Sequence, residues 1–357
     1  MSASVTTRFW QGRRVLLTGH TGFKGSWAAL WLCQMGAEVT GISLEPEDTN
    51  AHYNQIADKL PLSHHIVDIR DKEALGAAVR QANPEIVLHM AAQALVRRSY
   101  VHPVETFETN VMGTANLLEC LTDCADLQAV LIITSDKVYK NLDDGRVFTE
   151  DDPLGGDDPY SASKAAAEIV TASFDKSFYR RADIPLATGR AGNVIGGGDF
   201  AEDRLIPDIY RAAAKAKPVT LRHPGSTRPW QHVLESVSGY LVYLEALVAD
   251  TERALPRALN FGPRTAETLT VGEIADEIQQ AFGINKNWDL DKADTPPEKA
   301  FLSLNTDLAQ QALSWKTAWN TAQTLEKTVA WYKAMSEGQD MYLYSLSQIE
   351  EYEAANG

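Results

Sequence analysis

The sequence predicts an α/β protein with a doubly wound, parallel Rossmann-type sheet and a smaller mixed α/β C-terminal lobe. Up to about residue 190, short runs of aliphatic and β-branched residues alternate with longer helical stretches, as in a parallel sheet wrapped by helices. The first run, RRVLLT at 13–18, leads into a glycine-rich turn that opens a helix. After Gly192 this alternation is broken by glycines and prolines.

The elements can be placed in order along the chain. Strands are expected at 13–18, 38–43, 65–67, 85–89, 129–134 and 185–190, and helices at 24–35, 71–81, 106–123 and 160–179. Beyond residue 192 we expect strand-like pieces at 219–221, 258–261 and 301–304, and helices at 271–281 and 321–335. We therefore predict a Rossmann domain over 1–190, to which about 225–265 cross back, and a lobe made mainly of 191–357.

Composition narrows the classes of function. The 357 residues carry 33 Lys and Arg against 48 Asp and Glu, a formal charge of -15. Such a chain repels polyanions at long range, so we expect no nucleic-acid or membrane-surface partner, although a local cluster of donors can still bind a small anion.

The cysteines and the apolar runs bear on location. The three cysteines, Cys33, Cys120 and Cys124, suit a reducing compartment better than a disulfide framework, and their neighbours do not have metal-ligand spacing, so no metal is expected. Residues 1–12 lack a signal-peptide core, and no apolar run approaches the roughly 18 residues of a membrane span. These features predict a cytoplasmic protein.

The glycine turn predicts a dinucleotide site. Gly19, Gly22 and Gly25 follow the first strand directly, and this spacing permits a tight turn and the close approach of a pyrophosphate to a helix N-terminus. Glycines also serve simple strand-to-helix turns. The strand, turn and helix context near the N-terminus favours the dinucleotide interpretation.

A tyrosine and a lysine indicate acid–base chemistry. YSASK at 160–164 places Tyr160 and Lys164 four residues apart, on one face of a helix. A tyrosine, with a pKa near ~10, is a poor base, and a neighbouring ammonium is expected to lower that pKa by stabilising the phenolate.

Together these motifs resemble the extended short-chain dehydrogenase/reductase superfamily, and within it the nucleotide-sugar epimerases and dehydratases. The resemblance covers roughly residues 12 to 335 and implies NAD as cofactor. It assigns cofactor contacts to Gly19, Thr21, Gly22, Phe23, Lys24, Gly25, Ser43, Asp68, Ile69, Ala91, Ala92, Gln93, Asn110, Thr134, Tyr160 and Lys164.

The sequence departs from that family at the second strand. Ser43 stands where the family usually has the acid that binds the adenosine ribose, and Glu45 is a candidate substitute. No Arg or Lys follows to attract a 2′-phosphate, so NAD is favoured over NADP. Asp68 matches the family's adenine-recognising residue, but its position equally suits a helix N-cap. Asn110 resembles the family's structural asparagine.

The segment Ser135-Asp136-Lys137 ends a buried strand at the edge where ligands of α/β sheets bind. It resembles the variant found in sugar 4,6-dehydratases that act on CDP-glucose. The resemblance implies that Ser135 orients the sugar, that Asp136 is the acid for the 6-hydroxyl, and that Lys137 stands where a Glu base usually stands. Lys137 would be either a base or an enolate stabiliser. The alternative is a solvated turn capped by Asp136.

Later segments resemble the family's substrate-binding motifs. They are RAGNVIG at 190–196, LIP at 205–207, TRPWQHV at 227–233, NFG at 260–262 and EKA at 298–300. The resemblance implies substrate contacts from Asn193, Leu205, Arg228, Asn260 and Glu298.

The resulting hypothesis is a lyase that converts CDP-D-glucose to CDP-4-keto-6-deoxy-D-glucose, moving hydride from carbon 4 to carbon 6 through tightly bound NAD. A nucleotide-sugar 4-epimerase is the alternative, and a non-catalytic NAD-binding regulatory protein or a simple alcohol reductase is more remote. The resemblance further implies synthesis of dideoxysugars for bacterial surface polysaccharide and a homodimer built on helices 106–123 and 160–179.

Overall fold

The computed structural model describes residues 3–215, 217–263, 269–291, 299 and 301–356. Its main sheet is parallel, with strand order β11-β6-β5-β4-β1-β2-β3. The strands are β1 (Arg14–Thr18), β2 (Glu38–Ser43), β3 (Ser63–Ile66), β4 (Ile86–His89), β5 (Ala129–Ile133), β6 (Leu186–Ala191) and β11 (Ala258–Phe261). The order reverses at β1 and β4, which is the ligand-binding switch point of a doubly wound sheet. The predicted fold class is confirmed.

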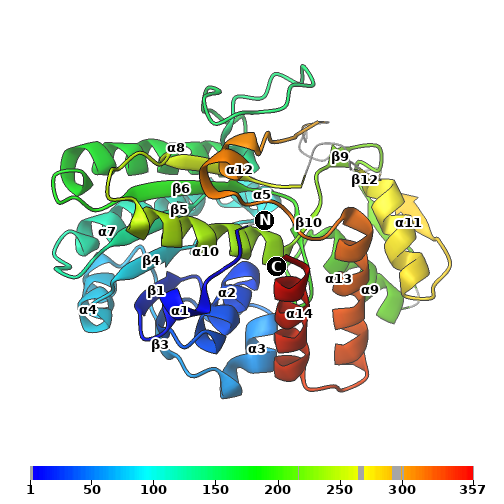
Figure 1. Cartoon of the computed structure of the whole chain (residues 1–357). Coiled ribbons are helices and arrows are strands. Elements are labelled where there is room, and N and C mark those ends of the chain that lie inside the picture. Colours follow the sequence, from blue (N-terminus) through cyan, green and yellow to red (C-terminus); the bar gives the residue numbers. More distant parts are fainter. Residues whose placement is uncertain (1–2, 216, 264–268, 292–298, 300, 357) are drawn as a thin grey trace.

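Helices cover both faces of this sheet (Figure 1). The helices of the described chain are α1 (Thr7–Trp10), α2 (Phe23–Gln34), α3 (His52–Ile56), α4 (Lys72–Ala82), α5 (Val96–Val101), α6 (Pro103–Phe107), α7 (Gly113–Leu121), α8 (Pro159–Phe174), α9 (Leu205–Ala214), α10 (Val233–Ala249), α11 (Val271–Ala281), α12 (Asp307–Leu313), α13 (Thr321–Ser336) and α14 (Met341–Asn356). Alternate strand residues supply the two cores: Leu16 and Val130 pack with α4 and α7, whereas Leu17 and Leu131 pack with α2 and α10.

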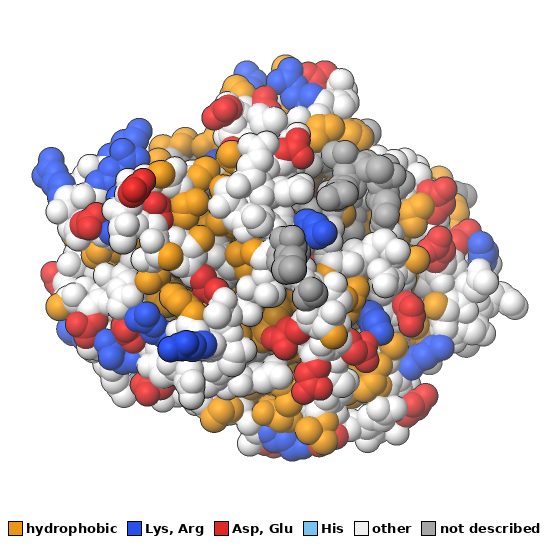
Figure 2. Space-filling model, in the orientation of Figure 1, with side chains coloured by type: hydrophobic (Ala, Val, Ile, Leu, Met, Phe, Trp, Pro, Cys, Tyr) orange, Lys and Arg blue, Asp and Glu red, His pale blue; other side chains and the backbone are white. Residues whose placement is uncertain are grey.

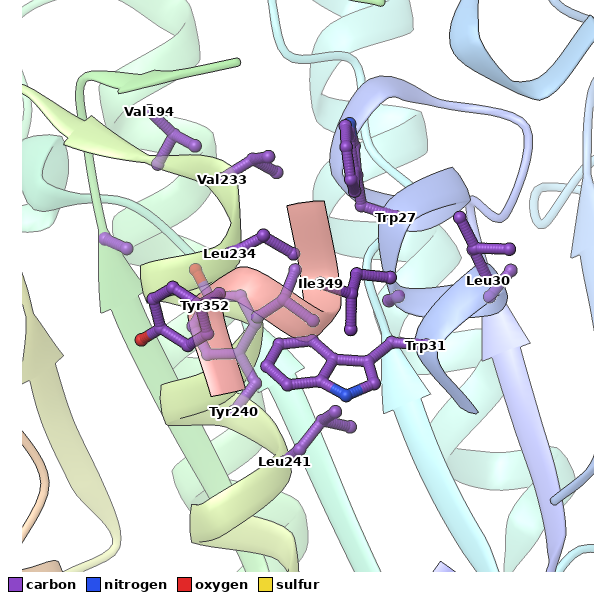
Figure 3. Packing of buried hydrophobic residues seen from close by; sticks show 14 of the residues in the cluster. Trp27, Leu30, Trp31, Val194, Val233, Leu234, Tyr240, Leu241, Ile349 and Tyr352 are labelled. Atoms are coloured by element: carbon purple, nitrogen blue, oxygen red, sulfur yellow. The ribbon is translucent and has the colours of Figure 1, made fainter. Parts of the chain in front are cut away.

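The last helix, α14, packs against α2 and α10, the helices on one face of the sheet. Figure 3 shows Trp27 and Trp31 of α2 packed with Leu234 and Tyr240 of α10 and with Ile349 of α14. A buried carboxylate adds a polar tie: Glu235 accepts hydrogen bonds from the Tyr352 hydroxyl at 2.6 Å and from the amide of Trp319 at 2.8 Å. Burial raises the pKa of Glu235 to about 7. The C-terminal helix is thus part of the Rossmann core.

The smaller lobe consists of short strand pairs with α9 and α11 beside them (Figure 1). In the described residues the pairs are β7 (Val194–Ile195) with β10 (Gln231–His232), β9 (Thr227–Arg228) with β12 (Leu269–Thr270), and β8 (Val219–Leu221) with β13 (Trp288–Leu290). A loop between Tyr139 and Leu154, closed by an antiparallel bridge at its base, projects from the molecule (Figure 1). Basic, acidic and hydrophobic side chains are interspersed over the described part of the face in Figure 2.

Several elements differ from the sequence expectation. Helices α9, α10 and α14 were not predicted: α10 is apolar on nearly all sides, so it lacks the periodicity of a surface helix. The expected strand at 301–304 is wrong, since only Leu304 forms a bridge, to Phe148. The expected helix at 106–123 is interrupted by a π-helical turn, Glu108–Met112, and the expected helix at 160–179 ends in one, Asp175–Tyr179. No helix of the described residues is both long and apolar enough to cross a bilayer.

Candidate active site

The glycine turn joins β1 to α2. Gly19 has φ +76°, and a Cβ on Gly25 would lie 1.9 Å from the carbonyl oxygen of Gly19. Only glycine at position 25 lets α2 pack so closely on the turn. The N-cap of α2 is Gly22, and no side chain caps this helix. The first amide groups of α2 are therefore left without a side-chain acceptor, as an anion-binding helix N-terminus requires.

The end of β2 uses a serine where an acid was expected. The hydroxyl of Ser43 lies 2.7 Å from that of Thr21, and the Thr21 hydroxyl donates to the carbonyl of Leu44 at 2.7 Å. Ser43 therefore ties the second strand to the glycine turn. Nearby is a pair of histidines that the sequence did not reveal, with Nε2 of His20 3.3 Å from Nδ1 of His64. Burial lowers the pKa of His20 to about 4.

The loop after β3 forms one wall of a cavity of about 600 Å³. Asp68 lines it and is held by the Arg70 guanidinium at 2.6 Å, which lowers the pKa of Asp68. The N-cap of α4 is Asp71, whose side chain accepts from the amide of Ala74 at 3.1 Å, so the N-cap alternative for Asp68 is wrong. The Ile69 side chain is buried in the core against α7.

Gln93 and Asn110 organise the loop after β4, where Ala91 and Ala92 are only partly buried. The Gln93 amide donates to Thr106 at 2.9 Å, and its oxygen accepts from the backbone of Leu95 at 2.6 Å. The Asn110 amide donates to the carbonyl of Gln93 at 3.0 Å and to the Ser163 hydroxyl of α8 at 2.8 Å. Both side chains are occupied by the protein itself, so in this structure they shape the loop.

Asp136 is the buried acid at the tip of β5, 2% exposed. It accepts a hydrogen bond from the Ser135 hydroxyl at 3.0 Å on one oxygen and from the Asn193 amide at 3.1 Å on the other. A Cβ on Gly192 would lie 1.9 Å from the Asp136 carboxyl carbon. The segment after β6, where Asn193 has φ +52°, is therefore shaped around this carboxylate. Lys137 follows, partly exposed.

Tyr160 and Lys164 lie on the first turns of α8. Asp158 caps this helix in a reciprocal pair with Ser161, and Pro159 occupies its first position. Both side chains are buried, and the Lys164 ammonium donates to the carbonyl of Ile133 at 3.3 Å. The capped start fixes where these two side chains emerge, beside the end of β5.

Burial dominates the ionisation of this pair. It lowers the pKa of Lys164 to about 7, an effect to which the charge of Lys24 adds and which Glu168 opposes. Burial raises the pKa of Tyr160, while a hydrogen bond with Ser135 and the charge of Arg204 lower it. The net direction for Tyr160 is upward, opposite to the sequence expectation, because desolvation of the phenolate outweighs the nearby donors. The charge of Asp136 also acts on Tyr160, which places the two groups in one site.

A buried ionic network lies behind the site and was not foreseen. The Glu168 carboxylate accepts from the Thr134 hydroxyl at 2.5 Å and from the Arg190 guanidinium at 2.9 Å. Arg190 also donates to the Tyr139 hydroxyl, which donates to the side-chain oxygen of Asn260 at 2.7 Å. Thr134 is therefore engaged by the protein in this structure.

Asn260, an expected substrate contact, lies inside the protein. It is fully buried, and its amide group donates to the backbone carbonyls of Phe148 and Asn305. Both ends of its side chain are therefore bonded to the protein scaffold in this structure. Its position just after a strand matched the family motif, but burial could not be read from that position.

The other expected substrate residues lie in the smaller lobe. Arg228 is buried and donates to the carbonyls of Thr227 at 2.9 Å and Lys299 at 2.8 Å. Leu205 begins α9, partly buried at the edge of the core. Glu298 lies outside the described residues.

Two residues near the acid escaped the sequence prediction. Arg204, just before α9, lowers the pKa of Tyr160 by its charge. Tyr240 of α10 is fully buried, and the charges of Asp136 and Tyr160 contribute to raising its pKa. The position of Arg204 directly before the motif at 205–207 was the one available signal.

Comparison with known proteins gives consistent results. The family model described as GDP-mannose 4,6-dehydratase matches residues 16–328. The chain is 44% identical to the CDP-glucose 4,6-dehydratase of Salmonella typhimurium, over 98% of this chain and 99% of that protein. A dTDP-glucose 4,6-dehydratase from Streptomyces venezuelae, solved with NAD bound, superposes with a TM-score of 0.78 at 25% identity, covering 92% of this chain and 99% of the other. The UDP-glucuronic acid 4-epimerase of Bacillus cereus shares the fold, with a TM-score of 0.78 at 21% identity, over 90% of this chain and 99% of the other.

Proposed function

The chain belongs to the GDP-mannose 4,6-dehydratase family of nucleotide-sugar dehydratases, and from that premise we propose that it converts CDP-D-glucose to CDP-4-keto-6-deoxy-D-glucose. It is a hydro-lyase. The observation that carries the choice of CDP-glucose is the 44% identity, over almost the whole chain, to a CDP-glucose 4,6-dehydratase. The Ser135-Asp136-Lys137 segment beside Tyr160 supplies groups for the elimination.

The residues present fit NAD as cofactor. The uncapped N-terminus of α2 and the close packing at Gly25 suit a pyrophosphate, and the cavity beside Asp68 suits the adenine end. Ser43, tied to Thr21, leaves a hydroxyl in place of an acid for the ribose. When bound, NAD⁺ supplies the acceptor for the hydride that leaves carbon 4 and later returns at carbon 6.

Tyr160 would carry out the first proton transfer. As phenolate it takes the proton of the 4-hydroxyl while hydride leaves carbon 4. Because burial raises the pKa of Tyr160, this form depends on positive charge beside it, which Arg204 supplies and which we also assign to the Lys164 ammonium. The Ser135 hydroxyl lies close enough to Tyr160 to lower its pKa, so it is placed to share the same sugar oxygen. The resulting 4-ketone acidifies the proton on carbon 5.

Asp136 and Lys137 would carry out the water loss. Asp136 gives a proton to the departing 6-hydroxyl, and Lys137 either removes the carbon 5 proton or stabilises the enolate. The two hydrogen bonds that Asp136 accepts orient its carboxyl group, which must carry a proton at the moment when the 6-hydroxyl leaves. Return of hydride to carbon 6 and of a proton to carbon 5 leaves no net redox change.

A panel of nucleotide hexoses tests the proposal. The protein is incubated with NAD⁺ and with CDP-, dTDP-, UDP- or GDP-linked hexoses, and products are assayed for the absorbance of a 4-keto sugar in alkali. We expect this absorbance with CDP-glucose at far lower substrate concentration than with the other nucleotides. A 4-epimer formed without that absorbance would identify the chain as an epimerase instead. Preference for another nucleotide would reject CDP-glucose.

We also propose a homodimer, because large apolar side chains are exposed on the adjoining helices α5, α6 and α8 and the π-helical turns. They are Tyr100, Val101, Val104, Phe107, Met112, Ile169 and Phe178. The Val104 side chain is 67% exposed. The substitution Val104→Glu places a charge there and is expected to shift the protein from dimer to monomer, as measured by light scattering. Leu343→Glu, on α14 at 60% exposure, is the matched control and is expected to leave the mass unchanged. If the Val104→Glu variant remained a dimer, the interface would lie elsewhere on the protein.

We also propose that the protein is cytoplasmic. The three cysteines carry free thiols, which suits the cytoplasm. In the pathway that we propose, the 4-keto-6-deoxy sugar is used to make dideoxysugars for surface polysaccharide.

A further inference from the structure

A second lysine reaches the catalytic groups from the glycine turn. Lys24 is the second residue of α2, and its ammonium donates to the Tyr240 hydroxyl at 3.4 Å and lies 5.8 Å from the centre of that ring. Tyr240 itself lies within the field of Tyr160 and Asp136. The side chain thus leaves the turn that suits the pyrophosphate and ends among the groups that suit the reacting sugar.

The ammonium of Lys24 has little compensation. Among the described residues it makes no ion pair, since its contact is with a neutral phenol. The pKa of Lys24 is lowered to about 8, chiefly by burial and also by the charge of Arg204, while the charge of Asp136 opposes both. Its charge also lowers the pKa of Lys164. Two cations, Lys164 and Arg204, and one carboxylate, Asp136, therefore interact electrostatically with Lys24.

This excess of positive charge bears on the two states of the cofactor. The nicotinamide ring is cationic in NAD⁺ and uncharged in NADH, so a nearby ammonium disfavours the oxidised ring relative to the reduced one. A lysine that only neutralised the pyrophosphate would favour both forms equally, because both carry the same phosphates.

We propose that Lys24 is an electrostatic residue of the reaction centre that biases bound nicotinamide toward its reduced form, and so promotes removal of hydride from carbon 4. The proposal rests on the proposed function in requiring NAD as cofactor. It assigns Lys24 a part separate from the one proposed for Lys164, which is to stabilise the Tyr160 phenolate. It also predicts that the enzyme holds NADH more tightly than NAD⁺.

The test compares binding of NAD⁺ and NADH by titration calorimetry in the full-length protein and in Lys24→Met. The variant is expected to lower the ratio of the NAD⁺ to the NADH dissociation constant by roughly tenfold. Lys24→Arg, which keeps the charge, is the matched control and is expected to retain most of the original ratio.

The outcomes separate the alternatives. Equal weakening of both nucleotides in Lys24→Met would assign Lys24 to the pyrophosphate and overturn the proposal. An unchanged ratio with unchanged affinities would also overturn it. If the unmodified protein bound neither nucleotide, the proposed function would fail at the cofactor, a result distinguishable from either.

Discussion

Asp136→Asn is expected to keep oxidising carbon 4 of the sugar while losing water elimination by roughly 10²–10⁴-fold. The amide has the shape of the carboxyl group but cannot supply the acid proton. Its oxygen can still accept from Asn193, and its NH₂ can donate to the Ser135 hydroxyl, so the local structure should persist. Reduced nicotinamide should therefore accumulate under single-turnover conditions, seen by its absorbance, without the 4-keto-6-deoxy product.

A neighbouring acid on the projecting loop is the control. Asp144→Asn breaks an exposed ion pair with Arg146 and is expected to leave both steps unchanged. Full turnover by Asp136→Asn would remove Asp136 from the mechanism. Equal loss of both steps would make it a group that orients the sugar.

Gly192→Ala is expected to reduce elimination by at least about 10²-fold without contact between the new methyl group and any sugar. The added Cβ would lie 1.9 Å from both the carboxyl carbon and one oxygen of Asp136, which is buried and held from two sides. The carboxyl group must therefore move, and a displacement of this size misplaces the acid. Steady-state formation of the 4-keto product measures the loss.

Two further variants make this result interpretable. Gly225→Ala adds a methyl group that has no atom of the described residues within 4 Å, and is expected to be nearly silent. In an Asp136→Ala background the Gly192→Ala change has room, so it should cost no further activity or thermal stability. Normal elimination by Gly192→Ala alone would show that Asp136 works from another position.

The sequence predicted the fold because local patterns carry it. Strand β2 was placed to the residue, and α2 to within one, since aliphatic runs and glycine punctuation act over a few positions. Helix α10 was missed for the opposite reason. It is buried on almost every side, so no polar face marks its period, and only the layer of α2 and α14 packed on it explains its composition.

The candidate site divides in the same way. Tyr160 and Lys164 are four residues apart on a helix, so their shared face follows from helical geometry alone. Asn260 matched a motif in the chain, but its partners Tyr139, Phe148 and Asn305 come from other segments and occupy it completely. Asn110, in the π-helical turn, likewise bonds to Gln93 and Ser163, which lie in other segments.

The sequence by itself determined the alternation of strands and helices, the glycine turn, the tyrosine–lysine pair and the acid at the end of β5. Each of these depends on neighbours within a turn or a strand. Only the tertiary structure decided that Gly192 and Asn193 enclose Asp136, that Glu168 holds Thr134 and Arg190, and that Lys24 ends beside Tyr240. Those contacts join residues up to 216 positions apart, and their geometry is set by the packing of whole helices against the sheet.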